Sequence, residues 1–322
     1  MQANAILGVD ISKKKFDACL LVGSKERHKV FYNNQEGFEK LVVWCNNHRA
    51  DFIHLCLEAT GCYSEGLVTF MYDLGHNVSM INPAQIKAFG KSELLRNKTD
   101  KSDAAMIARF CIANKPDLWK PISPEVSCLR ELYRCLQALK DDKLQQINRL
   151  ENKNMYSSCK QAILEVIATI DKQITALEKE INEHINNHSH LKNMIENIKT
   201  IKGIGHITAI AVVAEMPSVD NFDNARQFAA FAGLNPEHYQ SGSSVNRKSR
   251  VCKIGSERIQ KALYMPAIVV KNRNSHFQKF CQRLASKGKC PMVIIVALMR
   301  KLMHVFFGIL KNNQPFNGGL VK

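Results

Sequence analysis

The sequence of 322 residues lacks any closely spaced pair of cysteines. None of its 11 cysteines forms a Cys-x-x-Cys motif, which argues against a zinc ribbon and against a disulfide framework. We therefore expect most of the cysteines to be reduced and to lie in the core, where cysteine behaves as a small apolar residue.

Long apolar runs are also missing. The richest run, Pro291 to Met299, is shorter than the roughly 18 residues that a membrane helix needs. The first residues show no basic segment followed by a cleavable apolar one, so we expect a cytoplasmic protein. A content of 45% hydrophobic and 23% charged residues is typical of a globular chain, here long enough for two or three domains.

Acidic residues are scarce in the last quarter. From Ser241 onward there are sixteen Lys and Arg against one acid, Glu257, a net charge of +15. The whole chain carries 45 − 29 = +16, so residues 1–240 carry only +1. This segregation indicates a polyanionic partner, and nucleic acid is the best candidate.

The N-terminal third has a strand-rich pattern. It predicts three strands in succession and then helices that alternate with two further strands, which is typical of a mixed α/β sheet. The expected strands cover residues 5–10, 15–22, 28–32, 52–57 and 77–81, and the expected helices cover residues 35–47 and 63–74.

Four acidic residues fall at the ends of these elements. Asp10 ends the first strand and Glu58 follows the fourth, while Asp100 and Asp103 open a later helix. Taken alone, the last two are explained more simply by a helix start, with Asp100 as N-cap and Asp103 complementing the helix dipole. Together, the four carboxylates could converge on Mg²⁺ or Mn²⁺, and two such ions about 4 Å apart suit phosphoryl transfer.

The sequence after residue 122 becomes helical. Apolar residues recur at spacings of three and four from Leu129 to Leu139 and from Ile163 to Ile181. This pattern predicts core helices or an antiparallel or intermolecular coiled coil. We therefore divide the chain into an α/β domain (1–122), a helical linker (123–198) and a mostly α-helical basic domain (199–322), an α/β + α architecture.

Two motifs in the last domain could contact DNA. Gly203 and Gly205, beside Lys202, resemble a helix-hairpin-helix turn that cradles a phosphate, although an ordinary tight turn gives the same pattern. Ser241 lies in a Gly/Ser-rich stretch with cations close behind it, so it could be a nucleophile toward a phosphodiester. On residue types alone, a loop that only binds DNA is the simpler interpretation. The expected nucleic-acid contacts are Lys202, Gly203, Gly205, Arg247, Lys248, Arg250, Lys253 and Arg258.

Several segments resemble one family. The segments are Gly8-Val-Asp10 with Lys13 to Asp17, Glu58-Ala-Thr-Gly61, Ile81-Asn-Pro83 and residues 96–104. They are similar to the RuvC-like, RNase H-fold domain of the DEDD insertion-sequence transposases of the one-ten family, which is related to the Piv DNA invertase. Residues 228–244 and 262–267 resemble the C-terminal transposase domain of the same family.

The resemblance implies roles for individual residues. Asp10, Glu58, Asp100 and Asp103 become the four metal-binding acids, and the catalytic serine falls on Ser241, with Ser243 and Ser244 beside it. Gln260 stands where many members carry arginine, so Arg258 or Lys261 would have to substitute for it.

The hypothesis from these patterns is a DNA recombinase that mobilises an insertion sequence by Mg²⁺-dependent cleavage and rejoining through a covalent phosphoserine. Strand exchange needs at least two cut sites held together, so we expect a dimer with contacts from the helical region. The resemblance further implies assembly to a tetramer and a structured guide RNA. We expect the protein to be bacterial, cytoplasmic and associated with the nucleoid. No RRM or KH pattern indicates RNA binding independently. Two alternatives remain open, namely a RuvC-like nuclease that uses water without a covalent intermediate and a non-catalytic architectural DNA-binding protein.

Overall fold

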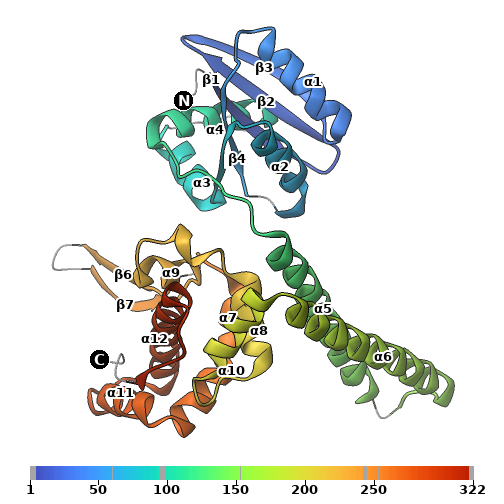
Figure 1. The fold of residues 1–322 in the computed structure, drawn as a ribbon, viewed down its shortest axis with the longest axis vertical. Coiled ribbons are helices and arrows are strands. Elements are labelled where there is room, and N and C mark those ends of the chain that lie inside the picture. The colour runs from blue at the N-terminus through green and yellow to red at the C-terminus, as the bar shows by residue number, and fades with distance from the viewer. Residues whose placement is uncertain are drawn as a thin grey trace. The chain divides into compact units, whose positions relative to one another are not determined.

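The computed structural model describes residues 5–59, 61–93, 99–152, 154–241, 245–252 and 254–318. The chain forms two compact units, Met1–Pro121 and Ile122–Lys322, each with its own core (Figure 1). The predicted helical linker lies inside the second unit, and its separation from the rest of that unit at residue 198 stays a prediction.

The first unit is built on a mixed sheet of five strands, as the sequence pattern predicts. The strands are β1 (Ala5–Ile11), β2 (Lys15–Val22), β3 (Lys25–Tyr32), β4 (Ile53–Glu58) and β5 (Asn77–Ile81), in the order β3-β2-β1-β4-β5. β1, β2 and β3 pair antiparallel, whereas β4 pairs parallel with β1 and with β5. β3 begins three residues earlier than expected because Gly23, at φ +59°, allows a tight turn after β2.

Helices cover both faces of this sheet. They are α1 (Gln35–Asn46), α2 (Glu65–Asp73), α3 (Pro83–Ser92) and α4 (Asp100–Asn114), with a short 3₁₀ turn at Gly61–Ser64. Side chains alternate between the faces along a strand, so Leu7 and Val9 join the core with α1 and α2. On the opposite face α4 packs through small residues such as Ala104 and Ala108.

The second unit is mostly helical. Its elements are α5 (Pro124–Leu150), α6 (Ser157–Asn187), α7 (Ser189–Lys199), α8 (His206–Glu215), a 3₁₀ turn at Val219–Asn221, α9 (Ala225–Phe231), β6 (Pro236–Ser241), β7 (Val245–Val251), α10 (Glu257–Arg273), α11 (Ser275–Ser286) and α12 (Pro291–Asn312). α7, α8, α9, α10 and α12 share one apolar core, and β6 and β7 form a separate antiparallel hairpin.

α5 and α6 pack as an antiparallel pair (Figure 1). Lys140 pairs with Glu178 and Lys143 with Asp171. Moving forward along α5 therefore means moving backward along α6, as in antiparallel helices. The apolar periodicity allows an antiparallel pair within one chain or a coiled coil between chains, and the structure has the pair within one chain. Toward the tip of the pair the apolar side chains are poorly covered, and Leu144 is 55% exposed.

α12 differs from the prediction that no apolar span is long enough for a membrane. It has 22 residues and is long and apolar enough by length and composition alone. The short run that the sequence shows continues, beyond the charged pair Arg300 and Lys301, with Leu302, Met303 and Phe306. These apolar residues lie in the core of the second unit, so α12 is a core helix here.

Most of the described cysteines are free, as predicted, but their pairing and their burial differ from the prediction in part. Cys56 and Cys111 are joined by a disulfide bond, which the spacing of cysteines along the chain could not indicate because β4 and α4 meet only in the fold. Among the free cysteines whose side chains the structure describes, Cys19, Cys45 and Cys281 are buried, but the four at 128, 135, 159 and 290 are exposed.

Candidate metal centre and serine hairpin

The position of α4 on the sheet depends on Gly8. A Cβ atom at Gly8 would fall well inside van der Waals contact with the backbone oxygen of Ala104 and the backbone nitrogen of Ala108. Only glycine permits so close an approach of helix and strand. Because Asp10 lies two residues beyond Gly8, its side chain points to the same face of the sheet as the helix.

Asp10 lies among other carboxylates. Its pKa is raised from 3.8 to about 6, first by burial and then by the negative charges of Asp103, Asp100, Glu58 and Asp17. The other three predicted metal-binding acids are therefore close enough to Asp10 to raise its pKa. The fold brings the N-terminal strand, the end of β4 and the start of α4 into one electrostatic environment.

The start of α4 corrects one part of the prediction. Thr99, and not Asp100, is the N-cap, and it forms a capping box with Ser102 in which each side chain accepts from the other residue's backbone N–H. Asp100 and Asp103 occupy the first turn, where the partial positive charge of the helix N-terminus stabilises carboxylates. Capping therefore does not require Asp100, which leaves its carboxylate available for another role.

Glu58 is the last residue of β4 and pairs with Ile81 of β5. Beyond it the backbone N–H of Ala59 donates to the carbonyl oxygen of Ile81, which extends the ladder by one bond. Glu58 and Cys56 are two residues apart, so both side chains lie on the face that α4 covers.

Two residues that the sequence prediction did not single out belong to this cluster. Asp17 lies opposite Asp10 in the β1–β2 ladder and is largely buried. The ammonium of Lys15 lies 3.4 Å from an Asp100 carboxylate oxygen and 3.8 Å from an Asp17 carboxylate oxygen. The hairpin register would have revealed Asp17, because directly opposed residues share a face of the sheet.

Oxygen donors of this kind fit a hard divalent cation. Among the described residues, the groups of three or more candidate ligands within 4.8 Å of one another are His54 with Cys56 and Cys111, and Cys19 with Glu26 and His28. The four acids do not form so tight a group. Asp100 is 64% exposed on its side chain, and the ammonium of Lys15 lies 3.4 Å from one of its oxygens.

Ser241 is the last residue of β6, opposite Val245 of β7. Residues 242–244, with Ser243 and Ser244, lie outside the described residues. At the base of the hairpin Gly233 and Gly255 approach each other so closely that a Cβ atom on Gly255 would overlap the Gly233 backbone. Gln260 stabilises this base, because its Nε2 atom donates to the carbonyl oxygen of Ala232 at 3.0 Å.

Each of the two cations suggested as substitutes for an arginine at 260 lies near a carboxylate of the second unit. Lys261 pairs with Asp141 of α5 at 2.9 Å. Arg258 lies 4.0 Å from Glu215, a buried carboxylate that also accepts two hydrogen bonds from Arg134, at 2.8 and 2.7 Å. The contact with Glu215 gives Arg258 a role within the fold that its position in the basic sequence did not indicate.

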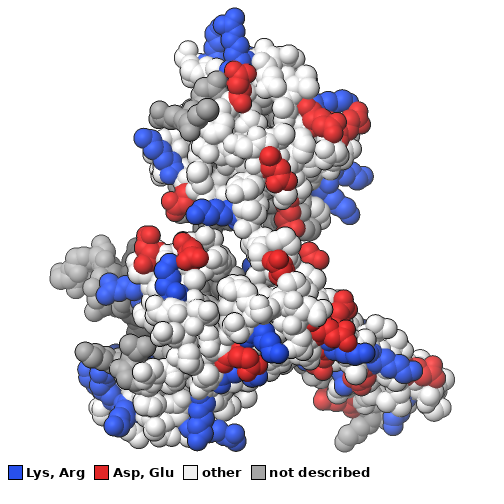
Figure 2. All heavy atoms as spheres, viewed as in Figure 1, with Lys and Arg blue, Asp and Glu red and all other residues white. Residues whose placement is uncertain are grey.

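The two glycines of the predicted DNA-binding turn have different local roles, close packing for Gly203 and the start of a helix for Gly205. Gly203, at φ +106°, lies against Val270 of α10, and Gly205 is the N-cap of α8. Lys202 and Arg250 are exposed, Arg247 and Lys248 lie on β7, and Lys253 lies outside the described residues. Figure 2 shows further Lys and Arg side chains over the α11 end of the unit, where Lys279, Arg283, Lys287 and Lys289 occur.

Comparison with known proteins agrees with these features. Residues 7–153 match the DEDD group described as "Transposase", and residues 195–282 match the "Transposase IS116/IS110/IS902 family". The pilin gene-inverting protein of Moraxella bovis is 35% identical over 97% of this chain and 97% of its own length. A transposase for insertion sequence element IS1111A from Coxiella burnetii is 24% identical, covering 74% of this chain and 70% of its own.

RuvC of Thermus thermophilus covers 36% of this chain and 99% of its own, at 11% identity and a TM-score of 0.27, which is too low to support any argument. The sequence matches carry the conclusion. Because the relatedness extends along nearly the whole length, the chain belongs to the IS116/IS110/IS902 family of DEDD transposases and is a DNA recombinase.

Proposed function

We propose that this recombinase cuts and rejoins DNA with two cooperating groups, a divalent-metal site in the first unit and Ser241 in the second. The observation that carries the proposal is the clustering of Asp10, Glu58, Asp100 and Asp103 around the strand end where α4 meets the sheet. Four carboxylates held near one another are unfavourable without a compensating cation, so their retention in the fold supports a metal-binding role.

Asp10, Glu58, Asp100 and Asp103 would hold Mg²⁺ or Mn²⁺, since all their donors are hard oxygens. When bound, such ions activate a hydroxyl group and stabilise a leaving oxygen in phosphoryl transfer. The chain's own contribution is positioning. β1 and β4 fix Asp10 and Glu58 from the sheet, while the capped start of α4 presents Asp100 and Asp103 from the other side.

Ser241 is the proposed nucleophile. Its Oγ atom forms a bond to the scissile phosphorus, the bond from phosphorus to a sugar oxygen breaks, and that oxygen leaves with a proton as a hydroxyl group. The phosphoserine ester keeps the energy of the broken bond. Attack by a sugar hydroxyl of a second strand then rejoins the DNA and restores the serine. Arg247, Lys248, Arg250 and Lys253 supply positive charge for the phosphate oxygens.

Nucleic-acid binding and assembly complete the proposal. The net charge of +15 after residue 240 suits the DNA of element ends and targets and a structured guide RNA, the latter from the family resemblance alone. Strand exchange needs at least two cut sites held together, so a dimer that assembles to a tetramer is proposed. Exposed Leu144, Ile147 and Leu164 on the α5–α6 pair supply apolar surface for contact between copies.

The experiment that tests this function uses a nicked suicide substrate carrying an element end, purified protein with its co-purifying RNA, and Mg²⁺. We expect a protein–DNA adduct on a denaturing gel that disappears in Ser241→Ala and in Asp10→Asn. Ser249→Ala, in the same hairpin, is the matched control and should keep the adduct. Ser243→Ala and Ser244→Ala identify which serine of the loop reacts.

Two other outcomes would favour the two alternative functions, a nuclease that uses water or a non-catalytic DNA-binding protein. Cleavage that needs Mg²⁺ but leaves no adduct, and that survives Ser241→Ala, would make the protein a water-using nuclease. DNA binding without any Mg²⁺-dependent reaction in the wild-type chain would favour an architectural protein.

A further inference from the structure

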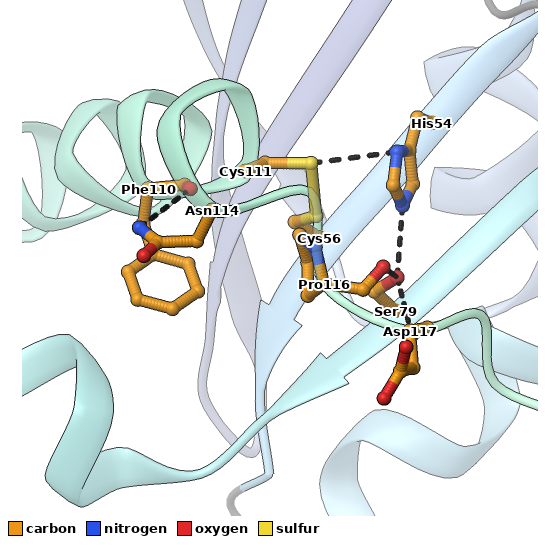
Figure 3. The surroundings of a disulfide bond; sticks show 8 residues. All are labelled: His54, Cys56, Ser79, Phe110, Cys111, Asn114, Pro116 and Asp117. Carbon is orange, nitrogen blue, oxygen red and sulfur yellow. Dashed lines mark hydrogen bonds between the residues drawn. A yellow bond between two sulfur atoms is a disulfide. The ribbon is translucent and has the colours of Figure 1, made fainter.

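A buried sulfur pair joins the two elements that carry the acids. Cys56 on β4 and Cys111 on α4 form a disulfide bond across 55 residues of sequence (Figure 3). Both sulfur atoms lie in the core, where Cys56 is fully buried and Cys111 is nearly so. His54, two residues before Cys56, completes the group, and its Nδ1 atom lies 3.5 Å from the Cys111 sulfur.

The hydrogen bonds around His54 fix which of its nitrogens carries the proton. Its Nε2 atom lies 2.8 Å from the hydroxyl oxygen of Ser79, and that oxygen lies 2.8 Å from the carbonyl oxygen of Asp117 and 3.2 Å from that of Pro116 (Figure 3). Carbonyls only accept, so the Ser79 hydroxyl donates to one of them and accepts from Nε2–H. Nδ1 of His54 is then a bare acceptor that faces Cys111.

This tautomer has a consequence for the sulfur. A disulfide sulfur has no proton to donate, whereas a Cys111 thiol would donate to Nδ1 and satisfy it. Burial lowers the pKa of His54, which keeps the ring neutral and preserves this acceptor. The pocket therefore brings the two sulfur atoms together for the disulfide and supplies a hydrogen-bond acceptor for the dithiol, so each state has a partner in the fold.

The pair is also linked mechanically to the acid cluster. Cys56 is two residues before Glu58 on the same strand face, and Cys111 lies two turns beyond Asp103 on α4. Gly8, Cys56 and Ser79 are aligned across β1, β4 and β5. The disulfide between Cys56 of β4 and Cys111 of α4 therefore restrains the helix that carries Asp100 and Asp103.

We propose that Cys56 and Cys111 form a reversible thiol–disulfide switch that sets the affinity of the four-acid cluster for divalent cations. This inference rests on the proposed metal-binding function of those acids. In the oxidised state the disulfide pins α4 against β4, which preorganises Asp100 and Asp103 relative to Asp10 and Glu58 and tightens cation binding. In the reduced state Cys111 donates to His54 and the helix is held by packing alone.

The exchange balances with a small dithiol as co-reactant. Its thiolate attacks one sulfur of the pair, the Cys56–Cys111 bond breaks, and the other cysteine leaves as a thiolate that takes up a proton. The second thiol of the reagent then attacks the mixed disulfide, releases the remaining cysteine and closes the reagent's own disulfide. Two electrons and two protons pass from the reagent to the protein, and the reverse reaction restores the disulfide.

The test measures oxidation and cation binding on the full-length chain. The protein is equilibrated in mixtures of a dithiol and its cyclic disulfide, with and without Mn²⁺, then quenched in acid, alkylated under denaturing conditions and analysed as peptides by mass spectrometry. Mn²⁺ affinity is measured separately on each redox state. We expect the oxidised state to bind Mn²⁺ about fivefold more tightly than the reduced state. This factor is at the lower end of the range in which one site commonly changes the affinity of another.

Thermodynamic linkage sharpens the expectation. Mn²⁺ must shift the reagent ratio at half-oxidation by the same factor by which oxidation changes the Mn²⁺ affinity. Cys56→Ser/Cys111→Ser and Cys56→Ala/Cys111→Ala should make affinity insensitive to the reagent ratio. Cys128→Ser removes an exposed thiol and is the matched control, which should behave as the wild type.

Three results would overturn the switch. Both cysteines could be alkylated as free thiols at every reagent ratio, the two states could bind Mn²⁺ equally, or the reduced chain could retain one zinc ion that Cys111→Ser loses, which would make this a structural metal site. Absence of Mn²⁺ binding in both states would overturn the proposed acid site together with the coupling. Alkylation of Cys56 and Cys111 at each reagent ratio distinguishes failure of the switch from failure of the acid site, because the redox state of the cysteines can be measured without cation binding.

Discussion

The two units hold their proposed reactive groups in different ways. In the first, acids from distant parts of the sequence meet because α4 packs closely on β1 at Gly8, so the cluster depends on tertiary structure. In the second, Ser241 ends one strand of a local hairpin whose base is closed by Gly233, Gly255 and Gln260. The carboxylates are therefore sensitive to core packing, whereas the serine depends on a short segment.

The units also differ in charge. The first unit (residues 1–121) has 16 Lys and Arg against 13 acids, a net charge of 16 − 13 = +3, and the second (residues 122–322) has 29 against 16, a net charge of 29 − 16 = +13. Acids concentrated at one site attract cations, and a basic surface attracts phosphate groups. This difference suggests a division of labour in which one unit supplies metal ions and the other supplies phosphate binding and the nucleophile, and it can be tested by damaging each unit alone.

The largest effect is expected from Gly8→Val. The added side chain would overlap the backbone of α4 at Ala104 and Ala108, which cannot move without displacing the helix from the sheet. We expect the first unit to lose about 3 kcal/mol or more of its free energy of unfolding. Mn²⁺ binding should be lost with it, as measured by denaturant unfolding and metal titration.

Gly66→Ala is the matched control for Gly8. A Cβ atom at Gly66 would lie 3.4 Å from Phe38, an ordinary contact, and this residue sits within α2. Alanine in a helix is more favourable than glycine, so the free energy of unfolding should stay the same or rise slightly. Equal damage from both substitutions would show that α4 does not depend on the close approach at Gly8.

The second unit should be most sensitive at Glu215, whose side chain is only 3% exposed. Arg134→Met removes its two hydrogen-bond donors and leaves a buried charge with Arg258 4.0 Å away. We expect a loss of about 3 kcal/mol in the free energy of unfolding of this unit. Unfolding in denaturant measures the loss, and Mn²⁺ affinity of the first unit should not change.

Lys199→Met is the control for Arg134, since it breaks an exposed pair with Glu196 and should cost at most about 1 kcal/mol. The double change Arg134→Met/Glu215→Gln should recover part of the lost stability, because no buried charge remains. Failure of the double variant to recover any stability would mean that Arg134 acts through packing of its side chain.

The alternation of apolar residues predicts the mixed sheet of the first unit and the positions of Asp10 and Glu58, because this pattern is local and strong. The capping residue of α4 was assigned wrongly, since Thr99 and Asp100 are both good N-caps and sequence alone does not choose between neighbours. Asp17 was overlooked because its relation to Asp10 is set by the hairpin register.

Long-range contacts explain the other differences. Nothing in the spacing of Cys56 and Cys111 indicates that they meet, and nothing near Arg258 indicates a buried partner 43 residues earlier at Glu215. The apolar length of α12 was underestimated because its charged residues interrupt the run without preventing burial of the other face. The placement of Ser241 relative to the acids stays a prediction.

Cation binding should depend on pH in the range set by Asp10. Its pKa of about 6 in the folded chain means that protons compete with the cation below pH 6. We expect the apparent Mn²⁺ affinity to be constant above this value and to fall about tenfold per pH unit below it, as for one displaced proton. Isothermal titration between pH 5 and 8 measures this profile.

The same pKa predicts an opposite trend in stability without divalent ions. Between pH 3.8 and about 6 the native chain binds a proton that the unfolded chain has released, so the free energy of unfolding falls as pH rises through this window. Asp10→Asn should abolish this dependence. A Mn²⁺ affinity that declines only near pH 4 would show that burial and the neighbouring acids do not raise the pKa of Asp10.

The smallest effect is expected from Lys15, the cation at the edge of the acid cluster. Its ammonium lies 3.4 Å from Asp100 and is half exposed, so water and salt weaken the interaction. Since a divalent ion would compete with this ammonium for Asp100, Lys15→Met should tighten Mn²⁺ binding, by about twofold at low salt. Lys14→Met removes a neighbouring exposed charge and should change Mn²⁺ affinity less.

If both variants bind Mn²⁺ equally, Lys15 acts only through the overall charge of the unit. A gain in affinity that is confined to Lys15→Met and fades at high salt would place the bound Mn²⁺ beside Asp100.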